Sequence, residues 1–214
     1  MKKEVCFSTA YLAPIEYYAH IVGSDRAIIE VNDNYVKQTY RNRCAISTAN
    51  GVQHLSIPVE KPHNQKCLTK DLRISNHGNW QHTHWNAIES AYNNTPFFEY
   101  YKDFFKPIYD NHTDFLVDFN LRLMETICGL IDIDVSFDTT KEYYDGKSEM
   151  ILDLRSEINP KRKEGEYTDG FTPVKYYQVF EDRHGFIPNL SVIDLLFNMG
   201  PESLIVLNNS ICRI

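Results

Sequence analysis

The chain has 214 residues, of which 43% are hydrophobic and 24% are charged, a balance that suits one sizeable domain with a core of its own. Its formal net charge of -7 would repel a phosphate backbone at long range, so broad nucleic-acid binding is disfavoured and a small anionic ligand fits better. Five scattered cysteines without a C-x-x-C pair argue against a disulfide framework and against a zinc ribbon.

The N-terminal stretch MKKEVCFSTAYLAP has a basic pair but no unbroken apolar run before Pro14, and nowhere do about 18 apolar residues follow one another. We therefore expect no signal peptide and no membrane-spanning helix, and we expect the protein to be soluble and cytoplasmic. The sequence identifies no cofactor, and it leaves the oligomeric state open.

The first part of the chain predicts a strand, a helix and a second strand. Residues 4–8 (EVCFS) are short and apolar, residues 15–25 (IEYYAHIVGSD) have the pattern of a helix, and residues 26–31 (RAIIEV) have that of a buried strand. This order predicts a β-α-β unit with parallel pairing. Functional groups gather at the carboxyl ends of parallel strands, so we expect the loop 9–12 and Asp33 to lie there.

Asn50-Gly51, between two alternating runs, is the sequence signal of a type I′ β-hairpin. With these two residues as the turn, Ile46 would face Leu55 across the hairpin. Side chains alternate along a strand, so one face would be apolar and the other polar. The apolar face would carry Cys44, Ile46, Leu55 and Ile57, and the polar face Arg43, Ser47, His54 and Ser56.

Three cations, Lys37, Arg41 and Arg43, stand close together in a stretch without a carboxylate. If the first hairpin strand extends back to Lys37, all three project from its polar face, with Arg41 and Arg43 about 6.6 Å apart at roughly 3.3 Å per residue. Two guanidinium groups at that separation would clamp adjacent phosphates, or a phosphate and a carboxylate. The alternative is a solvated strand face whose arginines pair with local acids.

After residue 79 the periodicity changes to that of helices. Amphipathic patterns predict helices over residues 80–93, 97–111 and 114–130. The second should kink or end near Pro107, and Gly129 is expected to mark the fraying end of the third.

Residues 138–185 differ in composition, because polar and charged pieces alternate there with short apolar ones. They include the basic run 161–163. A long polar segment of this kind predicts a loop or lid excursion, and the charge run by itself favours a plain solvated loop.

The C-terminal part predicts two helices. Residues 191–200 begin with a capping-box pattern, Ser191 and Asp194, and residues 201–207 follow with Pro201 at the start of a short helix.

No G-x-S-x-G, Walker, G-x-G-x-x-G or H-E-x-x-H motif occurs. On a helix His82 and His84 would point about 200° apart and could not ligate one ion, so we expect no metal site. His84 and Asp33 are the candidate acid–base groups. The alternatives are a histidine that hydrogen-bonds in the core or at the surface, and an aspartate that caps a turn.

Several segments together resemble the WbqC-like protein family, which is met among bacterial genes for O-antigen and related surface polysaccharides. The segments that carry the resemblance are AYLAPIEYYAHIVGSD, NDNYVKQTYRNRCAI, LSIPVEKP, NWQHTHWNAIESAYNNTPFFEYY and PNLSVIDLLFNMGPE.

The resemblance implies a role in surface polysaccharide synthesis, with transfer of an amino acid such as glycine onto a sugar as the expected kind of reaction. It carries over no catalytic residue. Many relatives begin with Gln-Pro-x-Tyr-Leu-Pro, whereas this chain has Ser-Thr-Ala-Tyr-Leu-Ala-Pro over residues 8–14, so a role for that glutamine is not transferred. The triplet Arg41-Asn42-Arg43 does match the family pattern and favours an anion site.

The sequence therefore predicts an α/β or α+β fold: an N-terminal β-α-β unit, a mixed sheet that includes a β-hairpin, and a mainly helical half, in a single domain over residues 1–214. The expected function is a transferase that places an aminoacyl or acyl group on a sugar. The alternative is a non-catalytic protein that binds sugar phosphates or nucleotide-sugars, or that serves in assembly. The expected catalytic residues are Asp33 and His84. The expected ligand-binding residues are Tyr11, Lys37, Tyr40, Arg41, Asn42, Arg43 and His54.

Overall fold

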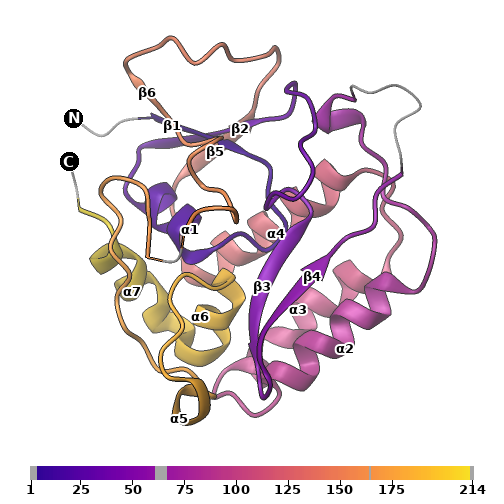
Figure 1. Ribbon diagram of the computed structural model, residues 1–214, viewed down its shortest axis with the longest axis vertical. Helices are drawn as coiled ribbons and strands as arrows, with labels where there is room; N and C mark the ends of the chain where they lie inside the picture. Colours follow the sequence, from indigo (N-terminus) through magenta and orange to yellow (C-terminus); the bar gives the residue numbers. More distant parts are fainter. Residues whose placement is uncertain (1–3, 61–66, 164, 213–214) are drawn as a thin grey trace.

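The computed structural model describes residues 4–60, 67–163 and 165–212. It contains a four-stranded sheet, a separate two-stranded hairpin and a set of helices that pack around them (Figure 1). The four-stranded sheet consists of β1 (Glu4–Ser8), β2 (Arg26–Glu30), β5 (Ser136–Thr139) and β6 (Ile151–Asp153), and the hairpin of β3 (Arg43–Thr48) and β4 (Gly51–Ser56). The helices are α1 (Ile15–Val22), α2 (Trp80–Tyr92), α3 (Phe98–Asp110), α4 (Leu116–Ile131), α5 (Glu181–His184), α6 (Val192–Met199) and α7 (Ser203–Ser210), with short 3-10 turns η1 (Thr69–Asp71) and η2 (Gly200–Glu202).

The four-stranded sheet is parallel throughout, in the order β5-β2-β1-β6. The predicted β-α-β unit is confirmed: β1, α1 and β2 follow one another, and β1 pairs in parallel with β2. Val5, Cys6 and Phe7 of the inner strand β1 are all buried, as expected for a strand covered on both faces. Two strands were not predicted, β5 and β6, because each is short, lies at a sheet edge and carries polar side chains.

The hairpin turns one residue earlier than predicted. Its loop is Ala49-Asn50, Thr48 pairs with Gly51, and Cys44 pairs with Leu55. Gly51 takes φ +104°, a conformation that glycine adopts without steric cost. The predicted register is therefore wrong by two residues, but the faces are kept because side chains repeat with a period of two.

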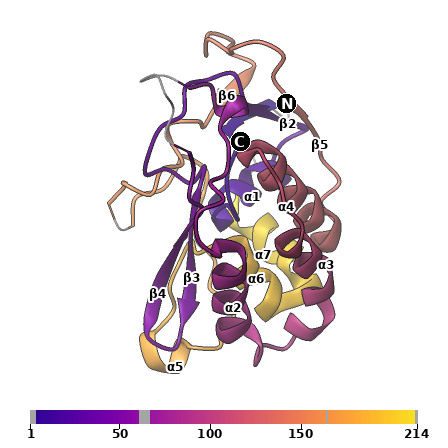
Figure 2. The same cartoon turned by 90° about the vertical axis from the view of Figure 1, so that its right-hand side faces the viewer.

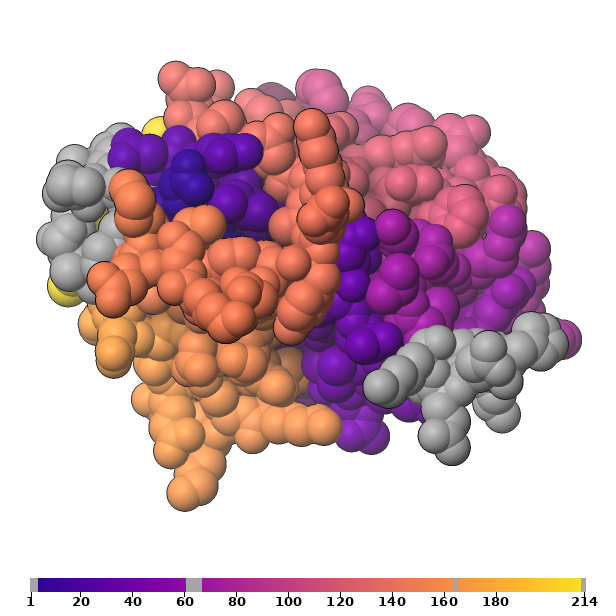
Figure 3. Space-filling model, turned by 90° about the horizontal axis from the view of Figure 1, so that it is seen from above, coloured from indigo at the N-terminus to yellow at the C-terminus, as the bar shows by residue number. Residues whose placement is uncertain are grey.

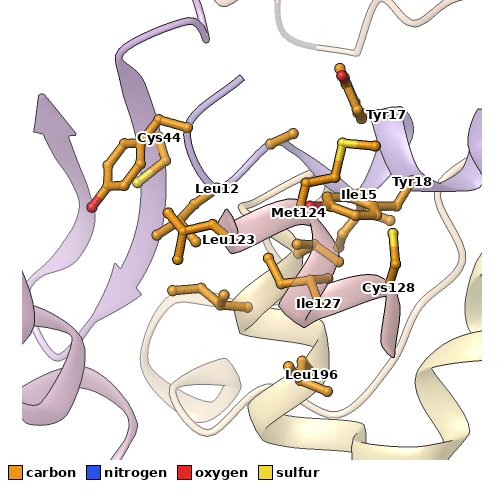
Figure 4. Close-up of a cluster of buried hydrophobic side chains, with 14 of the residues drawn as sticks. Leu12, Ile15, Tyr17, Tyr18, Cys44, Leu123, Met124, Ile127, Cys128 and Leu196 are labelled. Carbon is orange, nitrogen blue, oxygen red and sulfur yellow. The ribbon is translucent and has the colours of Figure 1, made fainter. Parts of the chain in front are cut away.

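Helix α4 forms the centre of the core (Figure 4). Leu123 and Ile127 of α4 lie near Leu12 and Ile15 on one side and near Leu196 of α6 on another. The helix continues past Gly129 to Ile131, so the predicted fraying at the glycine is wrong by two residues.

The other helices surround this core. Helix α3 continues through Pro107 to Asp110, and α1 packs against α6 and α7. In Figure 2 the hairpin forms the left side of the molecule, and α2 and α6 lie next to it on its inner side. Within the described ranges, every helix is too short or too polar to cross a lipid bilayer.

The capping box predicted at the start of α6 is wrong. The Ser191 hydroxyl caps nothing among the described residues. Asp194 is fully buried and accepts hydrogen bonds from Tyr92 Oη at 2.9 Å, Tyr176 Oη at 2.6 Å and Gln178 Nε2 at 3.0 Å. Burial raises the pKa of Asp194 to about 6, against the lowering effect of these three donors. The carboxylate faces the core because two tyrosines and a glutamine supply its partners there.

Candidate functional site

The carboxyl ends of the parallel strands meet at one edge of the sheet, and this edge contains a topological switch point. From β1 the chain crosses through α1 to β2 on one side, while β6 pairs with β1 on the other side. Loops that leave such a strand pair diverge, and ligands of open parallel sheets bind in the crevice between them. Residues 8–10 at the end of β1 and residues 154–155 after β6 border this crevice.

Two adjoining spaces occupy the crevice. The larger, which we call the edge cleft, has a volume of about 310 Å³ and is lined by residues that include Asp33, Thr39, Arg41, Asp153, Arg155 and Asn159. The smaller, which we call the neck, has a volume of about 20 Å³, which is enough for one water-sized group. The two spaces share Thr39, Arg41, Arg155 and Asn159. Figure 3 looks down on the sheet end of the molecule and shows the orange segment that contains β6 beside the indigo and purple first fifty residues.

Arg41 is buried although it lies in a loop, with only 6% of its surface exposed. Its guanidinium forms an ion pair with Asp33, and Nη1 donates to Thr39 Oγ1 at 3.4 Å. The second oxygen of Asp33 accepts a hydrogen bond from Thr69 Oγ1 at 2.5 Å. Charge and hydrogen bonds together therefore orient both members of the pair, as a buried ion pair requires.

One donor of Arg41 remains available. Its Nε–H is buried and bonds to none of the described residues. A buried donor without a partner costs about 1–3 kcal/mol, so a water molecule or a ligand atom is expected to bind it. Arg41 is also fixed through its backbone, because Asn120 of α4 donates to the Arg41 carbonyl at 2.8 Å and to Thr9 Oγ1 at 3.2 Å.

Arg155 joins the segment that follows β6 to the rest of the sheet. Its Nε and Nη2 bind the two oxygens of Asp153 at 2.9 and 2.6 Å, and its Nη1 donates to the Tyr144 carbonyl at 2.8 Å. Nη1 also approaches Glu30 Oε2 at 3.4 Å. Glu30 ends β2, is fully buried, and accepts further hydrogen bonds from Thr140 Oγ1 and from the Tyr144 amide. Arg155 and Glu30 therefore hold the 140–155 segment against the carboxyl edge.

The edge cleft presents opposite charges at fixed positions. Burial by itself would raise the pKa of Asp153, but the hydrogen bonds and charge of Arg155 outweigh it and lower that pKa below its usual value. Burial and, after it, the charge of Glu16 raise the pKa of Tyr40, a residue that lines the neck, to about 12. Two guanidinium groups and two carboxylates thus line the cleft beside the Tyr143 ring, which is 60% exposed.

The start of α1 is closed to a phosphate group. In dinucleotide-binding sheets the first helix after β1 points free backbone amides at the phosphates. Here the Ile15 amide donates to the Leu190 carbonyl at 3.0 Å, and the Glu16 amide donates to Asn189 Oδ1 at 2.9 Å. An anion at this sheet edge therefore receives no backbone donor from the start of α1.

The predicted extension of the hairpin strand back to Lys37 is wrong. β3 begins at Arg43, and the residues before it form a turn in which Gln38 takes φ 59°. The left-handed Gln38 and the turn at residues 40–42 interrupt the alternation on which the shared cationic face depended. As a result Arg41 is buried at the edge cleft, while Arg43 donates to a serine of β4 at 3.3 Å and does not line the cleft. Arg41 therefore pairs with a local acid, as the alternative interpretation of this stretch expected.

Tyr11 and His84 lie together inside the protein, away from the edge cleft. Tyr11 Oη is 2.9 Å from His84 Nδ1 and 2.9 Å from Tyr109 Oη. Only 6% of His84 is exposed, and burial lowers its pKa to about 4, against the smaller opposing effect of a hydrogen bond to the Ser56 backbone. His84 is therefore a neutral hydrogen-bonding group of the core, which was the alternative to an acid–base role.

The remaining candidates lie at different places. Lys37 is exposed, as is His54 on β4. Asn42 Nδ2 donates to the Ile57 carbonyl at 2.8 Å and so connects the turn to the hairpin. Of the residues expected from the sequence, Asp33, Tyr40 and Arg41 come together at the carboxyl edge.

Sequence reasoning missed Asp153, Arg155 and Asn159. They lie in the polar segment 138–185, where a three-residue edge strand has too few side chains to show an alternating pattern. One signal was present in the sequence, an aspartate that follows a short apolar run. Asp153 follows Ile151 and Leu152 just as Asp33 follows the apolar strand β2, and both carboxylates line the edge cleft. No group of three or more metal-ligating side chains forms in the part of the chain that the structure describes.

Comparison with known proteins gives one relative and one family. The uncharacterized protein Rv1507c of Mycobacterium tuberculosis is 28% identical to this chain, over 95% of this chain and 96% of its own length. No solved structure matches the chain. The sequence model of the WbqC-like protein family matches residues 9–177, a range that includes the loop after β1, the Arg41 turn and the residues after β6 that line the edge cleft. The chain therefore belongs to the WbqC-like protein family.

Proposed function

We propose that the edge cleft binds a sugar and that the protein transfers an acyl or aminoacyl group onto it during surface polysaccharide synthesis. The observation that carries this proposal is the pairing of Arg41 with Asp33 and of Arg155 with Asp153 around one space of about 310 Å³. A sugar hydroxyl both donates and accepts, so it is best bound by donors and acceptors at fixed positions. The exposed ring of Tyr143 offers an apolar surface to the sugar ring.

Asp33 is the group that fits the role of general base. Arg41 and Thr69 each bind one of its oxygens, and each oxygen keeps a second lone pair for a hydroxyl or amine of the sugar. The sugar oxygen or nitrogen attacks the carbonyl carbon of an activated ester or thioester donor, and its proton passes to Asp33. The donor's bond to its leaving group then breaks, and the leaving group takes up that proton.

A second candidate function is a protein that binds sugars without catalysis. It is favoured by the position of His84, which is buried with Tyr11 and Tyr109. Because none of the described histidines lines the edge cleft, Asp33 would have to serve all proton transfers of a catalytic reaction.

Ligand binding is tested by thermal unfolding with a panel of nucleotide-sugars, sugar phosphates and acyl donors. A ligand at 100 times its dissociation constant adds about 2.7 kcal/mol of stability, which is easily measured. A panel in which no member shifts the unfolding temperature would contradict both candidate functions.

The Asp33→Asn variant separates the two functions once a ligand is found. If Asp33 is the base, this variant loses turnover while it keeps measurable binding. The matched control is Asp71→Asn. Asp71 is an exposed aspartate of η1, the turn whose Thr69 binds Asp33. Binding by wild type without turnover of any acyl donor would favour the non-catalytic protein.

A further inference from the structure

The neck differs in chemistry from the edge cleft that it adjoins. Arg41 and Arg155 line it, together with the hydroxyl-bearing Thr9 and Tyr40 and the amide-bearing Asn159. No carboxylate among the described residues lines the neck, whereas Asp33 and Asp153 line the edge cleft. The neck is therefore the cationic end of a site whose other end carries both charges.

Two hydrogen-bond donors on residues that line the neck have no partner among the described residues. The Arg41 Nε–H is buried and bonds to none of them. Asn159 Oδ1 accepts from the Lys161 amide at 3.0 Å, while its Nδ2 bonds to none of the described residues. Unpaired donors beside two arginines require an acceptor, and an oxyanion is the acceptor that satisfies most of them.

From these observations we infer that the neck binds one phosphate oxygen of a phosphate-linked sugar. The neck holds about 20 Å³, so a single oxygen enters it while the sugar occupies the edge cleft. This inference rests on the proposed function for the position of the sugar, and it adds the chemical class of that sugar. The Arg41–Asp33 ion pair stays intact on binding, because the phosphate uses Nε–H and Asp33 uses another nitrogen of the guanidinium.

The rest of such a ligand has a place on the far side of the neck. A space of about 220 Å³, which we call the outer chamber, is lined by Arg162, Lys163, Tyr167 and others. It adjoins the neck across Tyr40 and Asn159, which line both spaces. Because the neck admits only one oxygen, a group joined to the sugar through phosphate would have to pass outside the neck to reach this chamber.

The decisive variant is Asn159→Asp. It keeps the oxygen that accepts from the Lys161 amide, so the turn is preserved, but it replaces the unpaired amide with a carboxylate. We expect the affinity for inorganic phosphate, measured by isothermal titration at constant ionic strength, to fall about tenfold or more, since a charged hydrogen bond is lost and like charges meet. The matched control is Asn94→Asp, which adds the same charge at an exposed position after α2 and should bind phosphate as wild type does.

Two results would overturn the inference. The first is that wild type binds no phosphate at millimolar concentration. The second is that Asn159→Asp and Asn94→Asp bind phosphate equally well although both unfold at the wild-type temperature. If Asn159→Asp proves unstable, a crystal grown with inorganic phosphate decides instead, because an oxygen must then lie within hydrogen-bond distance of Arg41 Nε. A comparison of uridine diphosphate with pyrophosphate then distinguishes the sources of the phosphate. Tighter binding of uridine diphosphate would support a nucleotide-linked sugar, and equal binding of the two would support a lipid-linked sugar.

The inference and the proposed function can fail separately. Phosphate binding that depends on Asn159 without any acyl transfer supports the phosphate site and contradicts the transferase. Suppose instead that wild type transfers an acyl group onto a free sugar but binds phosphate no better than Asn159→Asp does. That result supports the transferase and contradicts the phosphate site.

Discussion

At the scale of single residues, the buried ion pair of Arg41 and Asp33 governs the carboxyl edge. Pairs of this kind add little net stability, but removal of one partner costs about 3–5 kcal/mol because a buried charge is left alone. Arg41 lies in the turn before β3 and pairs with Asp33, whereas Arg43, two residues later, begins β3 and contacts a serine of β4. Residue type alone therefore does not determine which arginine serves the site.

The two buried histidines make stability depend on pH. Burial lowers the pKa of His84 to about 4, and burial with the charge of Arg162 lowers that of His20 to about 4 as well. Both are neutral in the folded protein, so the stability they contribute is complete above pH 6.5 and is lost as pH falls towards 4. The buried carboxyl of Asp194 acts in the opposite direction between pH 3.8 and about 6, because its pKa is raised by burial.

We therefore expect the free energy of unfolding to be lower at pH 5 than at pH 7. Each histidine should remove about 2 kcal/mol over this range and Asp194 should return about 1 kcal/mol. The His84→Gln variant keeps an acceptor for Tyr11 but cannot titrate, so its difference between the two pH values should be about 2 kcal/mol smaller. Urea unfolding at both pH values gives the measurement.

The control for the pH experiment is His54→Gln, because His54 is exposed on β4 and lies outside the buried cluster. It should show the wild-type difference. An equal difference in His84→Gln and wild type would mean that His84 is not a neutral core residue.

At the scale of elements, two glycines have opposite roles. Gly51 lies in the hairpin at φ +104°, a backbone conformation that residues with a Cβ rarely adopt. Gly129 lies in the exposed part of α4, where an added Cβ would meet nothing within 4 Å. Glycine lowers helix stability by about 0.5–1 kcal/mol relative to alanine. Gly129→Ala should therefore stabilise the protein by about that amount, and Gly51→Ala should destabilise it by about 1–3 kcal/mol.

Thermal and urea unfolding of these two variants gives the measurement. Because both changes add one methyl group to the same kind of residue, each serves as the control for the other. Destabilisation by Gly129→Ala would show that α4 is strained at its C-terminal end.

At the scale of the whole molecule, Arg155 attaches the 140–155 segment to the parallel sheet and so completes one wall of the edge cleft. Arg155→Met removes the charge that compensates the buried Glu30 and the partly exposed Asp153. We expect a loss of about 3–5 kcal/mol in the free energy of unfolding, because breaking a buried pair leaves its partner uncompensated. Amide hydrogen exchange should increase in β6 and in the residues before it, and ligand affinity should fall with the loss of that wall.

Arg26→Met is the matched control for Arg155→Met. Arg26 also bridges strands through Glu4 and Asp138, but it is 42% exposed. Its loss should change stability by about 1 kcal/mol or less, since exposed pairs are screened by solvent. Similar losses in the two variants would contradict the central role of Arg155.

The sequence by itself determined the elements whose signals are local. The β-α-β start, the hairpin with its apolar and polar faces, and the helices around residues 80–131 all follow from hydrophobic period and from the conformational preference of Asn-Gly. Local patterns also put Asp33 at the carboxyl end of a parallel strand, where the structure has it. These features depend on neighbours within a few residues, which is the range over which sequence patterns act.

The tertiary structure alone decided which side chains share a site. The turn at residues 40–42 separated Arg41, which pairs with Asp33, from Arg43 at the start of β3, and no periodic pattern reports such a break. Asp153, Arg155 and Asn159 joined the cleft because β6 pairs with β1 across more than 140 residues of chain. Contacts at that separation depend on sheet order, which the energies of packing and hydrogen bonding decide for the whole molecule at once.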